Sequence, residues 1–118
     1  MALALKRGNH RSMSYVRLIE VGRCNRDAGT FVERSGRELA VFRLGHPPRF
    51  IVIDNTCPHA GGNLSAGGVT GSIVTCPWHR WEFDLDSGSG VHSTQAKVTR
   101  YPVKLISQDL YADLDAPM

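Results

Sequence analysis

What is scarce in this sequence excludes several classes of protein. Apolar runs are short: stretches such as Phe50–Ile53 reach only four or five residues, whereas a membrane helix needs about 20. The apolar segment Met1–Leu5 is too short for the core of a signal peptide. The chain has only three cysteines, and their scattered spacing makes a poor disulfide framework. We therefore expect a protein of the reducing cytoplasm that does not insert into a membrane.

Helical periodicity and internal repeats are also absent, which points to an all-β fold. Short runs rich in valine, isoleucine and aromatic residues alternate with glycine-containing breaks, a pattern typical of a small antiparallel sandwich or barrel. We predict one domain over residues 14–115, preceded by a flexible basic tail over residues 1–13. The predicted strands are Tyr15–Val21, Thr30–Glu33, Glu38–Leu44, Phe50–Asp54, Ser72–Thr75, Trp81–Leu85, Val98–Ile106 and Leu110–Leu114.

Charge is distributed unevenly along the chain. Residues 1–50 carry ten Lys/Arg and four Asp/Glu, a balance of 10 − 4 = +6, while residues 51–118 carry four and seven, a balance of 4 − 7 = −3. Dispersed basic residues without interleaved aromatics give no support for nucleic-acid binding. Three of the acidic residues, Glu82, Asp84 and Asp86, follow one another closely. They fit either a dipolar molecule that is steered to a basic partner or ordinary solvated side chains.

Two short motifs combine cysteine, proline and histidine. Cys57-Pro58-His59 follows the predicted strand Phe50–Asp54, and after sixteen intervening residues Cys76-Pro77-Trp78-His79 follows the strand Ser72–Thr75. Each motif offers one thiolate and one imidazole, and proline restricts the backbone after each cysteine. Structural zinc sites rarely use such mixed, closely spaced pairs. A zinc site and a chance coincidence are the two alternatives to a dedicated metal centre.

These two motifs resemble the ligand boxes of Rieske 2Fe-2S proteins. The resemblance implies that Cys57 and Cys76 bind one iron of a 2Fe-2S cluster and that His59 and His79 bind the other. It also implies a small Rieske-like sandwich or barrel in which two loops form a cluster-binding subdomain. The resemblance extends over about Tyr15–Leu114, and the two boxes are its specific part.

The resemblance also predicts where the cluster lies on the potential scale. Two neutral imidazoles in place of two thiolates raise the potential from about −400 mV to a range of about −150 to +300 mV. High-potential relatives carry a disulfide between the loops and two hydroxyl donors, and the matching positions here are Gly62, Trp78, Trp81 and Phe83. We therefore expect a potential in the lower part of that range.

Four further residues invite a functional interpretation. We expect Cys24 to be a buried thiol rather than a ligand. His92 falls in a third segment that the resemblance places over the cluster, and we favour a solvent-exposed side chain there over a role in docking or proton release. Trp78 and Trp81 fit either a shield or a partner-facing patch, although the alternation from Trp81 to Leu85 favours core packing for Trp81.

The resulting functional hypothesis is an electron-transfer protein rather than an enzyme. We expect a soluble one-electron carrier that receives electrons from a flavin-containing NAD(P)H reductase and passes them to a terminal oxygenase or similar acceptor, with His59 and His79 at the exit. In 118 residues we expect no second catalytic iron domain. The alternatives are a small Rieske subunit bound to a large reductase subunit, as in assimilatory nitrite reductase, and a zinc-bound interaction module.

Overall fold

The computed structural model describes residues 14–58, 61–92 and 96–118, and these residues form an antiparallel all-β fold with two short 3-10 helices. The predicted fold class is therefore confirmed. The predicted tail, residues 1–13, lies outside the described residues. In chain order the elements are β1 (Tyr15–Glu20), η1 (Val21–Arg23), β2 (Ala28–Arg34), β3 (Arg37–Leu44), β4 (Arg49–Asp54), η2 (Leu64–Ala66), β5 (Gly68–Thr70), β6 (Ile73–Thr75), β7 (Glu82–Asp84), β8 (Arg100–Tyr101), β9 (Val103–Ile106) and β10 (Asp109–Asp113).

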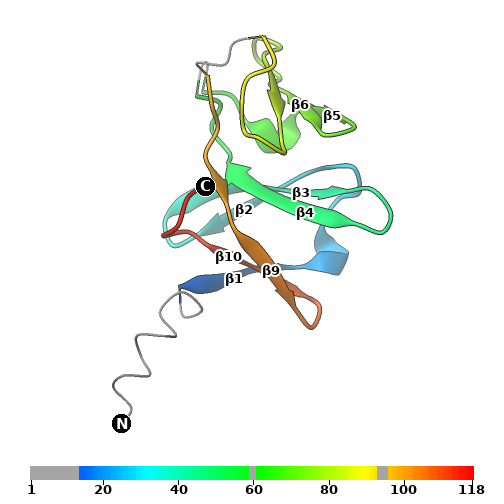
Figure 1. The fold of residues 1–118 in the computed structure, drawn as a ribbon, viewed down its shortest axis with the longest axis vertical. Helices are drawn as coiled ribbons and strands as arrows, with labels where there is room; N and C mark the ends of the chain where they lie inside the picture. The colour runs from blue at the N-terminus through cyan, green and yellow to red at the C-terminus, as the bar shows by residue number, and fades with distance from the viewer. Residues whose placement is uncertain (1–13, 59–60, 93–95) are drawn as a thin grey trace.

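A central sheet with strand order β2-β3-β4-β8 lies between the other two sheets (Figure 1). It separates two hydrophobic cores. Successive side chains of a strand point to opposite faces of the sheet. On β3, Leu39 and Val41 accordingly enter one core, whereas Ala40 and Phe42 enter the other. Because both faces are covered, β3 and β4 read in sequence as nearly continuous apolar runs.

The first core, which we call the outer core, lies between the central sheet and an outer sheet with strand order β1-β10-β9. Close packing of side chains from two sheets that face each other gives a sandwich. Its buried residues are Leu18, Cys24, Val32, Leu39, Val41, Val52, Tyr101, Leu110, Ala112 and Leu114.

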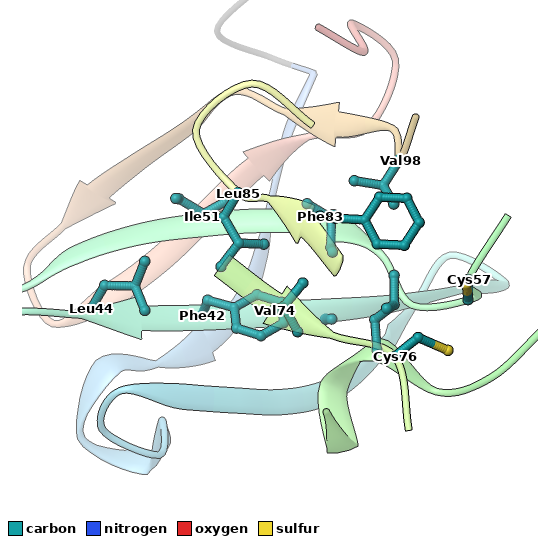
Figure 2. Packing of buried hydrophobic residues seen from close by; sticks show 12 residues of the cluster. Phe42, Leu44, Ile51, Cys57, Val74, Cys76, Phe83, Leu85 and Val98 are labelled. Atoms are coloured by element: carbon teal, nitrogen blue, oxygen red, sulfur yellow. The ribbon is translucent and has the colours of Figure 1, made fainter. Parts of the chain in front are cut away.

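The second core, which we call the loop-side core, lies between the central sheet and a small sheet with strand order β5-β6-β7. Figure 2 shows that Cys57 and Cys76 both lie at one end of this core, with Leu44 at the opposite end. The two candidate thiolates are therefore part of the packed interior. The buried residues are Ala40, Phe42, Leu44, Ile51, Ile53, Cys57, Leu64, Val74, Cys76, Phe83, Leu85 and Val98.

The structure divides one predicted strand between two sheets. The sequence pattern predicts a single strand over Val98–Ile106, but the chain pairs with β4 at β8, passes Pro102 and pairs with β10 at β9. Proline has no backbone N–H to donate to a ladder, while the Pro102 carbonyl still accepts a hydrogen bond from the Asp113 N–H at 3.0 Å. The proline therefore marks the point where the chain changes sheets.

Neither of the short helices could cross a membrane. Within residues 14–58, 61–92 and 96–118, no helix has the length and the hydropathy that a membrane span requires.

Candidate metal centre

The first candidate loop, Cys57–Gly62, begins directly after β4 and is closed by its own backbone. The Cys57 N–H donates to the Gly62 carbonyl at 2.9 Å, and the Gly61 N–H donates to the Cys57 carbonyl at 2.8 Å. Thr56 and Asn63, the residues on either side of the loop, pair in an antiparallel bridge. The loop is therefore a six-residue hairpin connection whose ends are fixed.

The second candidate loop, Cys76–Trp81, follows β6 and is closed by the same pattern of backbone hydrogen bonds, which we call the shared frame. The Cys76 N–H donates to the Trp81 carbonyl at 2.7 Å, and the Arg80 N–H donates to the Cys76 carbonyl at 2.9 Å. Thr75 and Glu82, the flanking residues, are paired in the β6–β7 ladder. In both loops the cysteine therefore donates to the fifth residue after it and accepts from the fourth.

The shared frame requires an unusual backbone conformation at the fourth residue after each cysteine. The φ angle there is +77° at Gly61 and +60° at Arg80. Glycine adopts positive φ without steric cost, whereas a residue with a Cβ adopts it only with a steric penalty. Loop 2 therefore holds a long cationic residue at a position where loop 1 has glycine.

The two loops touch each other at Gly62. A Cβ built on Gly62 would lie 2.9 Å from the Cys76 Sγ and 3.0 Å from the Trp78 Cγ, so the close approach of the loops depends on glycine at this position. Cys57 and Cys76 are 1% and 0% exposed, and neither forms a disulfide. Two buried thiols on adjacent loops are a donor set that suits an iron–sulfur cluster.

A buried asparagine attaches loop 1 to η2. Asn55 is 0% exposed. Its Nδ2 donates to the Asn63 Oδ1 at 2.7 Å, and its Oδ1 accepts from the Ser65 N–H at 2.9 Å. Its backbone also bonds on both sides, to the Glu38 carbonyl and from the Leu64 N–H. Buried polar groups are normally satisfied in this way, and the network fixes the chain two residues before Cys57. Apart from its position two residues before Cys57, nothing in the sequence marks Asn55 as part of the site.

Of the two motif histidines, only His79 is among the residues that the structure describes. His79 is exposed within loop 2, three residues after buried Cys76. His59 lies outside the described residues. No group of three or more His, Cys, Asp or Glu side chains placed to hold a metal occurs among the residues described, a set from which His59 is missing. The structure thus brings together Cys57 and Cys76 and leaves the four-ligand set as a prediction.

The acidic residues after loop 2 are engaged within the protein. The Glu82 Oε1 lies 3.0 Å from the His92 Nε2, and the Asp84 Oδ1 accepts from the Asp86 N–H at 2.8 Å. Asp86 also pairs with Arg49, whose hydrogen bond holds the pKa of this carboxyl below its usual value. His92 is largely exposed, as the sequence predicted. These carboxylates therefore fasten β7 and the segment after it to their neighbours.

A polar network lies at the foot of loop 1. The Tyr101 hydroxyl donates to the Asp54 Oδ1 at 2.6 Å, and Arg37 donates to the same hydroxyl oxygen at 3.4 Å. Burial, followed by the bond to Asp54, raises the pKa of Tyr101. These three residues line a shallow pocket together with Glu38 and Thr56. The network attaches the end of β4 to β8 and contains no predicted ligand.

The remaining cysteine and the second tryptophan behave as the sequence predicted. Cys24 is buried in the outer core, on the other side of the central sheet from the loops, and burial raises the pKa of its thiol. Trp81 packs against the loop-side core, whereas Trp78 is 65% exposed.

Comparison with known families agrees with this arrangement. A family model described as the Rieske [2Fe-2S] domain matches residues 14–102, a range that contains both loops. The chain belongs to the Rieske 2Fe-2S domain family. Membership implies one 2Fe-2S cluster per chain, and the buried cysteine pair on adjacent loops fits such a cluster.

Curated Rieske relatives are much longer proteins. The chain is 40% identical over 68 residues to the cholesterol 7-desaturase nvd of Xenopus laevis, a match that covers 57% of this chain and 13% of that protein. It is 44% identical over 55 residues to the oxygenase component of the 3-ketosteroid-9-alpha-monooxygenase of Mycobacterium tuberculosis, covering 47% of this chain and 14% of the relative. This Rieske chain thus matches only about one seventh of such a relative's length.

Two solved structures match this chain along most of both lengths. The ferredoxin of Sphingomonas yanoikuyae B1 superposes with a TM-score of 0.75 at 27% identity, covering 83% of this chain and 96% of the ferredoxin. A putative NADH-dependent nitrite reductase small subunit from Mycobacterium tuberculosis gives a TM-score of 0.75 at 22% identity, covering 83% and 92%. The second likeness shows a shared fold. The family match and the likeness to the ferredoxin support an electron carrier as the general character of this Rieske protein.

Proposed function

We propose that this Rieske chain is a one-electron carrier in which Cys57 and Cys76 bind the inner iron of the cluster and His59 and His79 bind the outer iron. The observation that carries the proposal is the contrast between the two donor types: the Cys57 and Cys76 side chains are buried, whereas His79 is exposed. When bound, a Rieske cluster accepts and returns a single electron. An exposed imidazole provides a short route from such a centre to a docked protein.

The partners follow from the same proposal. A flavin-containing NAD(P)H reductase would supply the electron, and a terminal oxygenase or similar acceptor would receive it, in the cytoplasm. Support comes from the match to the Sphingomonas ferredoxin along 96% of its length. A structure that shares this fold at 24% identity is a complex of reduced oxygenase and oxidised ferredoxin in carbazole 1,9a-dioxygenase.

Contacts around the loops support a potential in the lower Rieske range. The positions that would carry the inter-loop disulfide of high-potential relatives are Gly62 and Trp78, and a Cβ on Gly62 would lie 3.0 Å from the Trp78 Cγ. The positions of the two hydroxyl donors are Trp81 and Phe83, neither of which carries a hydroxyl. We expect a midpoint potential nearer about −150 mV than +300 mV.

The ligand set is tested by spectroscopy of variants. Purified protein should be coloured and, after reduction by dithionite, should give the electron paramagnetic resonance signal of a reduced 2Fe-2S cluster. His79→Ala should lose that signal, and iron per chain should fall. His46→Ala is the matched control, because His46 is exposed in the turn between β3 and β4. A His79→Ala protein with an unchanged spectrum and potential would refute the assignment, and a colourless zinc protein would refute the proposal as a whole.

A fixed small subunit of a reductase is the second candidate function. The specific observation in its favour is that two nitrite reductase small subunits share the fold with TM-scores of 0.72 and 0.75. The two functions differ in their association with a partner. Co-elution with a large subunit at high salt would favour the subunit, whereas a monomer that a generic ferredoxin reductase reduces with NADPH would favour the carrier.

A further inference from the structure

Arg80 occupies a backbone position that disfavours it. Its φ of +60° corresponds to the +77° of Gly61 in the matched loop. The other described non-glycine residues with positive φ are Asp27, Ser35 and Ser107, which have short polar side chains and lie in turns. Aspartate tolerates this region because its short side chain can form local hydrogen bonds, whereas a bulky side chain there is an outlier. An arginine held at positive φ, where glycine would carry no strain, points to a role for its side chain.

The charge of Arg80 is not used inside the protein. Arg80 is exposed, and among the residues described it makes no ion pair. The neighbouring carboxylates are already engaged, since Glu82 pairs with His92 and Asp86 with Arg49. Although the sequence from Glu82 to Asp86 looks acidic, the cation of loop 2 is left available to a partner.

An exposed aromatic residue lies on the other side of His79. Trp78 is 65% exposed, and with Arg80 it flanks the exposed histidine in sequence. Tryptophan and arginine are enriched among the residues that contribute most to binding at protein interfaces. The guanidinium group also pairs with carboxylates in a two-pronged geometry that lysine does not offer. The tip of loop 2 therefore combines an apolar contact with an anion-binding contact.

We propose that Trp78 and Arg80 form the recognition contact for an acidic surface of the electron-transfer partner, with Arg80 pairing with a partner carboxylate beside His79. This inference rests on the proposed function of electron transfer at His79. It assigns an acidic partner surface, opposite in sign to the basic one that the acidic run in the sequence suggested, because those acids have internal partners.

Small oxidants of opposite charge test the local charge at this exit. In each reaction one electron leaves the reduced protein, reducing either the Fe(III) of hexacyanoferrate(III) or the Co(III) of tris(phenanthroline)cobalt(III). A shift in the protein's potential changes both rates in the same direction, so the ratio of the two rates reports the local charge. At low ionic strength Arg80→Gln should lower the hexacyanoferrate-to-cobalt ratio about three- to fivefold. Arg80→Lys should keep the ratio, as should Arg23→Gln, an exposed arginine in η1.

A second measurement does not depend on the cluster. Iodide and caesium quench the fluorescence of exposed tryptophan, and the ratio of their quenching constants reports the charge near Trp78. Arg80→Gln should lower the iodide-to-caesium ratio, and Trp78→Phe should remove most of the quenching because Trp81 is partly buried. Arg80→Gly should match Arg80→Gln in both assays and should unfold at a higher urea concentration, because glycine relieves the positive φ.

The outcomes separate this proposal from the proposed function. If the protein exchanges electrons with both oxidants and Arg80→Gln changes neither ratio, the recognition contact is refuted while the carrier stands. If the protein exchanges no electron with either oxidant, the carrier function fails, and the quenching ratio still decides whether Arg80 sets the charge at the loop. An Arg80→Gly variant that is less stable than the wild type would show that arginine is retained for the fold instead.

Discussion

Replacing Asn55 by alanine should destabilise the protein around loop 1 more than the substitution of an exposed residue of that loop would. The change removes the hydrogen bonds from Nδ2 to the Asn63 Oδ1 (2.7 Å) and from the Ser65 N–H to Oδ1 (2.9 Å). The net contribution of one hydrogen bond to stability is about 1 kcal/mol, and a half-buried N–H left without a partner costs about 2 kcal/mol more. Because Asn63 is exposed, its amide can bond to water instead. The total is about 3 kcal/mol.

Urea unfolding followed by circular dichroism measures this loss. With a dependence of about 1–3 kcal/mol per molar urea, a loss of about 3 kcal/mol should lower the midpoint by about 1–3 M. Iron per chain should fall as well, because the network fixes the backbone two residues before Cys57. Asn25→Ala is the matched control: its Nδ2 donates to the Gly29 carbonyl at 2.9 Å, and because Asn25 is exposed, the loss of this bond should cost about 1 kcal/mol or less. Equal midpoints for the two variants would refute the reasoning.

Three further predictions concern contacts described above. Gly62→Ala should lower the iron content per chain, because its Cβ would lie 2.9 Å from the Cys76 Sγ. Gly68→Ala is the control, because its Cβ would have nothing within 4 Å. Equal iron contents in the two variants would contradict a close contact between the loops at Gly62. Since the pKa of Asp86 is lowered by Arg49, the pair stabilises the fold above the unfolded pKa of about 3.9 and loses this effect as the pH falls through the folded value. Arg49→Ala should therefore cost up to about 1 kcal/mol at pH 7 and nothing at pH 2, as measured by urea unfolding at both pH values. Cys24, whose pKa is raised by burial, should react with iodoacetamide at pH 8 only after unfolding, a result that mass spectrometry of the alkylated peptide can check.

Much of the architecture was predictable because hydrophobic patterning determines which face of a strand is buried. The alternation through Phe83 and Leu85 predicted a strand with one buried face, and both side chains are 0% exposed. The hairpin around Ser35-Gly36 was also predicted, and both residues have the positive φ that such a turn needs. The apolar run before Cys57 became β4, with both faces covered.

The rest depends on contacts between segments that are distant in sequence. The change of sheets at Pro102 depends on which strands lie beside residues 100–106, and the sequence of that segment does not encode its neighbours. The common frame of the two loops was hidden because their sequences align poorly: glycine in one takes the place of Arg80 in the other. The role of Asn55 was hidden for a different reason: its partners Asn63 and Ser65 meet it only after loop 1 has closed.

The central sheet, with a core on each face, makes the metal end and the far end of the molecule mechanically dependent on each other. β3 supplies Phe42 to the interior beside the thiols and Val41 to the interior beneath the outer sheet. A disturbance of β3 from either side reaches the other through a single backbone. Because β3 contributes to both cores, we expect a substitution that destabilises this strand to affect the folding of the scaffold and the assembly of the inorganic centre together.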